Sequence, residues 1–149
     1  MTEVRFYHLQ GQTLEEGLPK LVEKISEAGL RAVIKTTDTE TRDRLDRALW
    51  EYNPTSFLPH GAEGCKSPEL QPVYLSSSED NPAAATIQVS INAIDPAQIS
   101  NFERCLFMFD GRDEQIVAEA RVAWKAIKEL GMEMSYWQQR EMGGWEKKA

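Results

Sequence analysis

The first half of the chain alternates between two spacings of its apolar residues. Residues 4–9 form a β-rich run, and a stretch with helical spacing follows Gly11. Thr13 and Glu16 stand in the positions of a capping box, which indicates that a helix begins there. This predicted helix stops near Gly29, and its apolar positions are Leu14, Leu18, Leu21, Val22 and Ile25.

A second strand and a second helix repeat this order. The apolar run over 32–35 predicts a short buried strand. Thr37 and Glu40 form another candidate capping box, before a helix that runs to about Trp50. Such alternation favours an α/β fold in which helices flank a mostly parallel sheet.

The second half of the chain continues the same domain. Residues 51–71 are rich in turn residues and predict a long loop. The elements predicted after it are strands over 73–75, 87–91 and 105–109, a helix over 114–130 capped by Asp113 or Asp110, and an edge strand over 132–138. No linker divides the chain, so we expect a single α/β domain over 1–139 and a flexible C-terminal tail over 140–149.

The charge of the chain bears on its partners. Its formal net charge is −7, whereas surfaces that bind phosphates gain affinity from Lys and Arg. Direct binding of nucleic acid is therefore disfavoured unless the chain carries a local basic patch. No apolar run is long enough to span a membrane, and the N-terminus does not resemble a signal peptide. We therefore expect a cytoplasmic protein that does not bind membranes.

Motifs for cofactor chemistry are missing from the sequence. Neither GxGxxG nor GxxxxGK[ST] occurs, so the chain lacks the loops that cradle nucleotide phosphates. The two cysteines form neither a CxxC pair nor a His–Cys cluster with the spacing of a zinc site. We therefore expect no metal and no other cofactor.

One catalytic alternative stays open. His60 and Cys65 lie close in sequence, and a small thiol-dependent hydrolase could use them as base and nucleophile, with Asp80 or Glu63 orienting the imidazole. The sequence context of known thiol enzymes is missing, and a structural or interface role is the competing interpretation of His60. His8, on the first predicted strand, suits a core or edge position.

The most informative local pattern is a cationic stripe on the last predicted helix. At ~100° per residue, Arg121, Lys125 and Lys128 fall within about 60° of one another, with Trp124 beside them. The apolar residues on the opposite side, which we expect to face the sheet, are Ile116, Ala120, Ala123, Ile127 and Leu130. The stripe suits a peptide that offers a carboxylate and an apolar anchor, while a solvated helix face is the alternative interpretation.

Large aromatic residues flank the start of the predicted loop. Trp50 ends the second helix, and Phe57 precedes Pro59 and His60. Burying such a side chain against a partner removes much apolar area from water, which makes both aromatic residues interface candidates. Capping of the local core is the alternative interpretation.

Several segments together resemble a known family. FYHL near the N-terminus, LDRALW, SFLPH and AWKAIKELG are similar, in order and spacing, to the chi subunit of bacterial DNA polymerase III. The resemblance covers nearly the whole chain. It implies a three-layer Rossmann-like α/β domain without a nucleotide-binding loop, and a non-catalytic adaptor of the replication machinery.

The resemblance implies a first partner surface on the last helix. In the family this surface binds the acidic C-terminal tail of single-stranded DNA-binding protein, which ends in Pro-Phe with a free carboxylate. The matching positions here are Arg121, Trp124, Lys125 and Lys128. Trp124 stands where the resemblance leads us to expect a tyrosine, and Val117 replaces a basic residue one turn earlier.

The resemblance implies a second partner surface after the second helix. In the family this surface docks the psi subunit, which links chi to the clamp loader. The matching positions here are Trp50, Phe57, Pro59 and His60.

Overall fold

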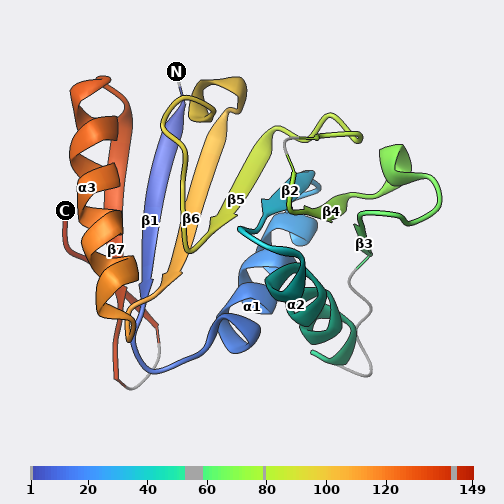
Figure 1. Cartoon of the computed structure of the whole chain (residues 1–149), viewed down its shortest axis with the longest axis horizontal. Coiled ribbons are helices and arrows are strands. Elements are labelled where there is room, and N and C mark those ends of the chain that lie inside the picture. The colour runs from blue at the N-terminus through green and yellow to red at the C-terminus, as the bar shows by residue number, and fades with distance from the viewer. Residues whose placement is uncertain (1, 53–58, 79, 142–143) are drawn as a thin grey trace.

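An eight-stranded sheet runs through the computed structural model, which describes residues 2–52, 59–78, 80–141 and 144–149 (Figure 1). The strands are β1 (Glu3–Leu9), β2 (Ala32–Lys35), β3 (Gly61–Ala62), β4 (Val73–Ser76), β5 (Ile87–Ile91), β6 (Arg104–Asp110), β7 (Glu133–Gln139) and β8 (Trp145–Lys147). Their order in the sheet is β3-β4-β2-β5-β6-β1-β7-β8. Every neighbouring pair is parallel except β7 and β8, which confirms the prediction of a mostly parallel sheet.

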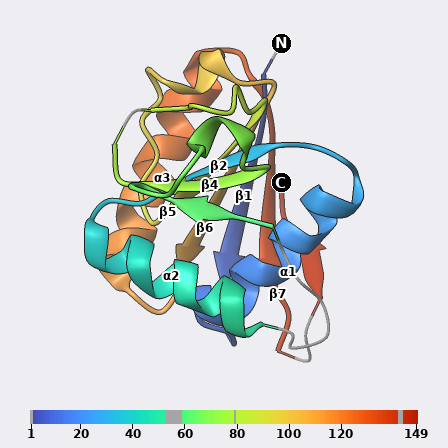
Figure 2. The same cartoon turned by 90° about the vertical axis from the view of Figure 1, so that its right-hand side faces the viewer.

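Helices cover both faces of this sheet. The α-helices are α1 (Leu14–Glu27), α2 (Thr39–Glu51) and α3 (Glu114–Glu129), and the short 3₁₀ turns are η1 (Pro68–Leu70) and η2 (Ile99–Asn101). Figure 2 shows α1 and α2 next to each other on the near side of the strands and α3 on the far side. The fold is therefore the expected three-layer, Rossmann-like α/β arrangement. No helix of the described residues is long and apolar enough to cross a membrane.

Alternation along β1 explains why the sheet has two apolar faces. Val4 and Phe6 join the buried cluster under α3, whereas Tyr7 and Leu9 join the cluster under α1 and α2. Successive side chains of a strand point to opposite faces, so this interior strand supplies residues to both cores. Phe6 is fully buried, and its ring meets the ring of Phe107 edge-on at a centroid distance of 5.1 Å.

The helix starts test the capping predictions. The Thr13 side chain accepts from the N–H of Glu16 while the Glu16 carboxylate accepts from the N–H of Thr13, which confirms the capping box of α1. The Thr37–Glu40 box is wrong, because Asp38 caps α2 and its carboxylate accepts from the Thr41 N–H at 2.7 Å. A carboxylate next to the helix start also interacts favourably with the helix dipole.

The segment after β7 differs from the prediction of a flexible tail over 140–149. Residues 145–147 form β8, which pairs antiparallel with β7, so β7 is not an edge strand. The Trp145 ring packs edge-on against the ring of Tyr7 at 5.2 Å. Burial of these two aromatic rings against each other stabilises the pairing of β8 with the sheet.

Short elements also occur within the predicted loop over 51–71. β3 adds two residues to the sheet edge beside β4, and η1 follows it. Elements of two or three residues carry no periodicity that sequence patterns can detect.

Candidate functional site

The cationic stripe of α3 faces away from the sheet. Arg121, Lys125 and Lys128 are exposed, while Ala120 and Ile127 are buried beneath them. The helix is therefore oriented as its sequence pattern predicted. Of the other apolar positions predicted to face the sheet, Ile116 and Ala123 are partly buried and pack against the core.

Leu130 is the exception on the apolar side of this helix. The prediction that it faces the sheet is wrong, because its side chain is 55% exposed. Leu130 is the C-cap residue, and the chain reverses at Gly131, whose φ is +76°. Beyond this point the helical periodicity no longer sets the direction of a side chain.

Trp124 lies between the exposed and buried sides of α3. Its ring packs edge-on against Phe6 at 5.2 Å and against Tyr136 at 5.6 Å, yet the side chain is only half-buried. The indole is thus fixed from below by the sheet and remains accessible beside Lys125 and Lys128. A rigid, partly exposed aromatic ring beside cations can form one wall of a pocket for an apolar group.

The stripe is electrostatically uncompensated. Within residues 2–52, 59–78, 80–141 and 144–149, no carboxylate lies within ion-pair distance of Arg121, Lys125 or Lys128. Their charges are therefore available to an external anion. In a chain of net charge −7, this stripe is a local reversal of sign.

A polar pair from β1 and β7 supports the stripe from below. The Tyr136 hydroxyl lies 2.7 Å from Nδ1 of His8. Burial lowers the pKa of His8, and the positive charge of Arg121 acts in the same direction, which favours the neutral imidazole. Burial also raises the pKa of Tyr136, so the phenol keeps its proton and can hydrogen-bond to this ring.

Tyr136 was not among the predicted site residues. Its role depends on the parallel pairing of β1 with β7, which puts Phe6 opposite Tyr136. The two segments are far apart in sequence, and β7 has no spacing that assigns its neighbour. Only the structure brings the Phe6, Trp124 and Tyr136 rings together.

The end of α2 presents a second candidate surface. Trp50 is 56% exposed, and its ring lies over the His60 ring at a centroid distance of 4.7 Å. His60 is buried, and its Nε2 is 3.1 Å from Oδ1 of Asp46. Pro59 is exposed, whereas Phe57 lies outside the residues that the structure describes. Trp50 is thus an exposed indole that packs on the buried ring of His60.

The groups proposed for a thiol hydrolase lie in separate environments. His60 packs between Trp50 and Asp46, both from α2. Cys65 instead lies beside Gly61, where an added Cβ would meet its Sγ at 2.8 Å, and it packs against the cluster that contains Tyr74. The geometry offers no support for their pairing as base and nucleophile.

The two carboxylates considered as orienting groups are engaged elsewhere. Glu63 accepts from the hydroxyl of Ser77 at 2.9 Å and from Arg42 at 2.9 Å. Asp80 accepts from the Tyr74 hydroxyl at 2.9 Å. Both groups therefore belong to a polar network around the end of β4.

The backbone N–H groups of the loop after β1 bind a side chain of the protein itself. The N–H groups of Gln10, Gly11 and Gln12 converge on Oε1 of Gln139, at 3.2, 3.0 and 3.1 Å. In nucleotide-binding α/β folds, N–H groups after the first strand point at a phosphate. Here a buried amide of the protein itself occupies that position.

The fold and these surfaces define an α/β domain that presents exposed cations and an exposed indole. A sequence profile of the family described as DNA polymerase III chi subunit, HolC, matches residues 1–135. The chain therefore belongs to the chi subunit family of DNA polymerase III, as its resemblance suggested.

A curated relative agrees with this assignment. The probable DNA polymerase III subunit chi of Rickettsia prowazekii (strain Madrid E) is 29% identical to the chain over 109 residues. The match covers 73% of this chain and 66% of that protein, which is slightly less than two thirds of its length.

Proposed function

We propose that the chain is a non-catalytic adaptor that binds the acidic C-terminal tail of single-stranded DNA-binding protein on α3 and connects it to the clamp loader through psi. The observation that carries the proposal is the arrangement of Arg121, Lys125 and Lys128. All three are exposed and lack an ion-pair partner within the part of the chain that the structure describes. They flank a half-buried indole whose position is fixed by two aromatic rings.

The two kinds of side chain would divide the work of binding. The cations attract an acidic chain and form charge-assisted hydrogen bonds with its terminal carboxylate, in particular from the planar guanidinium of Arg121. Trp124 contacts the terminal apolar side chain. Electrostatic attraction speeds encounter and is weakened by salt, while burial of the apolar anchor slows dissociation.

A titration with a synthetic acidic peptide ending in Pro-Phe tests this site. We expect Arg121→Glu and Lys125→Glu each to abolish measurable binding, because each replaces an attraction by a repulsion. Lys66→Glu provides a matched control, since Lys66 is exposed on a different part of the molecule. An amidated peptide should also bind poorly. Unchanged affinity of the α3 variants would contradict the site.

The second surface of the proposed adaptor docks psi through Trp50, Pro59, His60 and Phe57. Among the described residues, the support comes from Trp50, whose exposed ring packs on the buried His60 ring, and Nε2 of His60 lies 3.1 Å from Oδ1 of Asp46. A large aromatic side chain that is already ordered loses little conformational entropy when a partner covers it. Trp50 is therefore the residue expected to contribute most to docking.

A further inference from the structure

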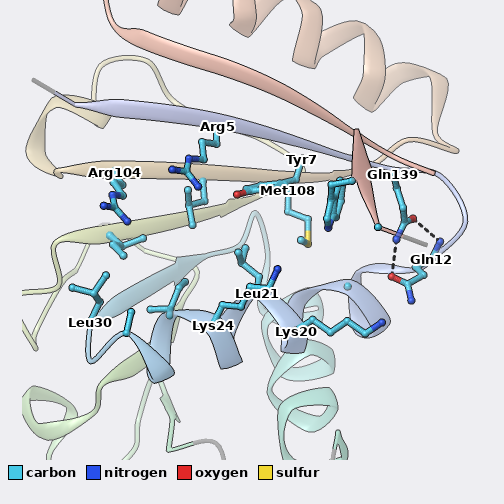
Figure 3. Close-up of a pocket in the computed structure, with 17 residues that line it drawn as sticks. Arg5, Tyr7, Gln12, Lys20, Leu21, Lys24, Leu30, Arg104, Met108 and Gln139 are labelled. Carbon is cyan, nitrogen blue, oxygen red and sulfur yellow. Dashed lines mark hydrogen bonds between the residues drawn. The ribbon is translucent and has the colours of Figure 1, made fainter. Parts of the chain in front are cut away.

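A hollow lies on the face of the sheet opposite α3, between α1 and strands β1 and β6. Its volume is about 390 Å³, which is within the range of ligand-binding pockets. Figure 3 shows Arg5 and Arg104 on the two adjacent strands and Lys20 and Lys24 on α1. The hollow therefore carries cations on both of its walls.

The charge of this hollow is opposite to that of the whole chain. Its lining, taken over the described residues, contains four Lys or Arg side chains and no Asp or Glu. Arg104, Lys20 and Lys24 are exposed, and the Arg5 side chain is 37% exposed. Since the chain as a whole has a net charge of −7, this absence of acids is a local feature of the groove.

The groove is ordered as well as cationic. The Nε–H of Arg5 donates to Oε1 of Glu3 at 2.7 Å, which orients a guanidinium that has five N–H donors. Lys20 and Lys24 are four residues apart on α1 and so project from successive turns of the same helix face. Cations on successive turns suit a ligand with negative charges repeated along its length.

Aromatic and aliphatic side chains form the rest of the lining. Tyr7 and Trp145 are half-buried and pack edge-on against each other at 5.2 Å. Leu21 and Met108 also line the hollow, and Figure 3 shows both near Tyr7. Half-exposed aromatic rings beside a line of cations can stack on flat rings of a ligand while the cations neutralise its negative charges.

We propose that this groove is a binding site for single-stranded nucleic acid, contacting a segment of a few nucleotides. Such sites combine a cationic groove that follows the phosphates with aromatic rings that contact the bases. An acidic peptide shares the negative charge, but one that ends in Pro-Phe supplies a single aromatic ring, whereas a single strand presents a flat base at every nucleotide to Tyr7 and Trp145. The proposal does not depend on the function assigned to α3, because the two surfaces lie on opposite faces of the sheet.

The net charge of the chain sets the expected strength of this interaction. Attraction in this groove comes from four side chains, one of which, Arg5, is already paired with Glu3, while the chain as a whole is acidic. Binding should therefore be weak and confined to low ionic strength. For single strands, the slope of log K against log salt is about −0.7 for each phosphate contacted, so four contacts give a slope of about −3.

Fluorescence anisotropy of a short labelled oligothymidine, titrated with the whole chain at low ionic strength, tests the proposal. We expect saturable binding that the double variant Lys20→Gln, Lys24→Gln weakens by about tenfold, with a slope reduced to about −1.4. The matched control is Lys125→Gln with Lys128→Gln, which neutralises two cations on the other face. These two substitutions should leave oligonucleotide binding intact and should weaken binding of the acidic peptide to α3.

An aromatic variant separates stacking from charge. Trp145→Phe should retain part of the affinity and Trp145→Leu should lose more of it, with unchanged salt slopes. Absence of binding at low salt would overturn the proposal, as would equal losses from the α1 and α3 double variants. If the acidic peptide displaced the oligonucleotide from the groove beside α1, the ligand of the groove would be an acidic peptide and not a nucleic acid. The affinities of the wild type and of the α1 double variant for the oligonucleotide are measured without the peptide, so they test the groove independently of the α3 site.

Discussion

The indole of Trp124 meets the ring of Phe6 almost at a right angle, with an interplanar angle of 88° and centroids 5.2 Å apart. Phe6 is fully buried in β1, an interior strand of the sheet, so this contact joins the proposed peptide site to the core of the domain. A packed aromatic pair contributes about 0.5–1.5 kcal/mol beyond the burial of its surface. The position of the binding wall is therefore determined by core packing.

Replacing Trp124 should affect stability and binding together. We expect Trp124→Ala to lower the free energy of unfolding by about 2 kcal/mol, because Phe6 and Tyr136 each lose the edge-on contact with the indole, and to abolish peptide binding. Trp124→Phe should retain most of the stability with weaker binding. Urea unfolding and peptide titration measure the two effects. Val122→Ala, at a position that is 69% exposed, should change neither by much.

Replacing Trp50 should leave the fold intact and remove the proposed psi contact. The side chain is 56% exposed, so Trp50→Ala should change the free energy of unfolding by about 1 kcal/mol or less. Copurification with psi from the same organism should be lost. Leu70→Ala is the matched control, because Leu70 is 67% exposed and lies outside this surface. Normal copurification of psi with the Trp50 variant would contradict the proposal that this surface docks psi.

Close packing at Gly111 predicts a severe effect from a single methyl group. A Cβ at this position would lie 2.2 Å from the His8 ring and 2.2 Å from the carbonyl oxygen of Leu9. We expect Gly111→Ala to lower the free energy of unfolding by about 3 kcal/mol, because the backbone of β1 must move. Gly131→Ala should cost only about 1 kcal/mol, since open space surrounds that residue and only its φ of +76° is unfavourable. Similar losses in the two variants would contradict this packing.

The Glu63 network predicts a pH dependence of stability. The Ser77 N–H and the Arg42 guanidinium lower the pKa of Glu63 from 4.5 to about 2 in the folded state, against an opposing effect of burial. Because the folded pKa is below the unfolded value, the carboxylate contributes stability above about pH 4.5, and this contribution is lost as the pH falls towards about 2.

Urea unfolding of the wild type and Glu63→Gln across this range measures the contribution. The variant should be less stable at neutral pH, and the difference should shrink as the pH falls below about 4.5. Glu27→Gln, at an exposed carboxylate on α1, should show no such convergence. A difference that stayed constant with pH would exclude the network as its cause.

The sequence predicted those features that arise from local periodicity. Helical spacing placed Arg121, Lys125 and Lys128 on one face of α3, and the structure exposes all three. The capping pair Thr13 and Glu16 likewise marked the start of α1. Within each of these two patterns the residues are only a few positions apart, so helix geometry alone determines how their side chains are placed.

Features that depend on contacts between distant segments could not be predicted. β8 has three residues, and it joins the sheet because Trp145 packs on Tyr7 from the other end of the chain. The α1 groove draws Arg5 and Arg104 from separate strands that only the sheet order brings together. No spacing along the chain relates these residues, so the groove has no sequence signature.

A pull-down tests most directly whether α3 binds the C-terminal tail of single-stranded DNA-binding protein. The whole chain is immobilised and offered single-stranded DNA-binding protein, either complete or lacking its last few residues, without nucleic acid. We predict capture of the complete protein, no capture of the truncated one, and no capture of either by the Lys125→Glu variant. Equal capture of the complete and truncated proteins would contradict the assignment of α3 as a receptor for the acidic chain end.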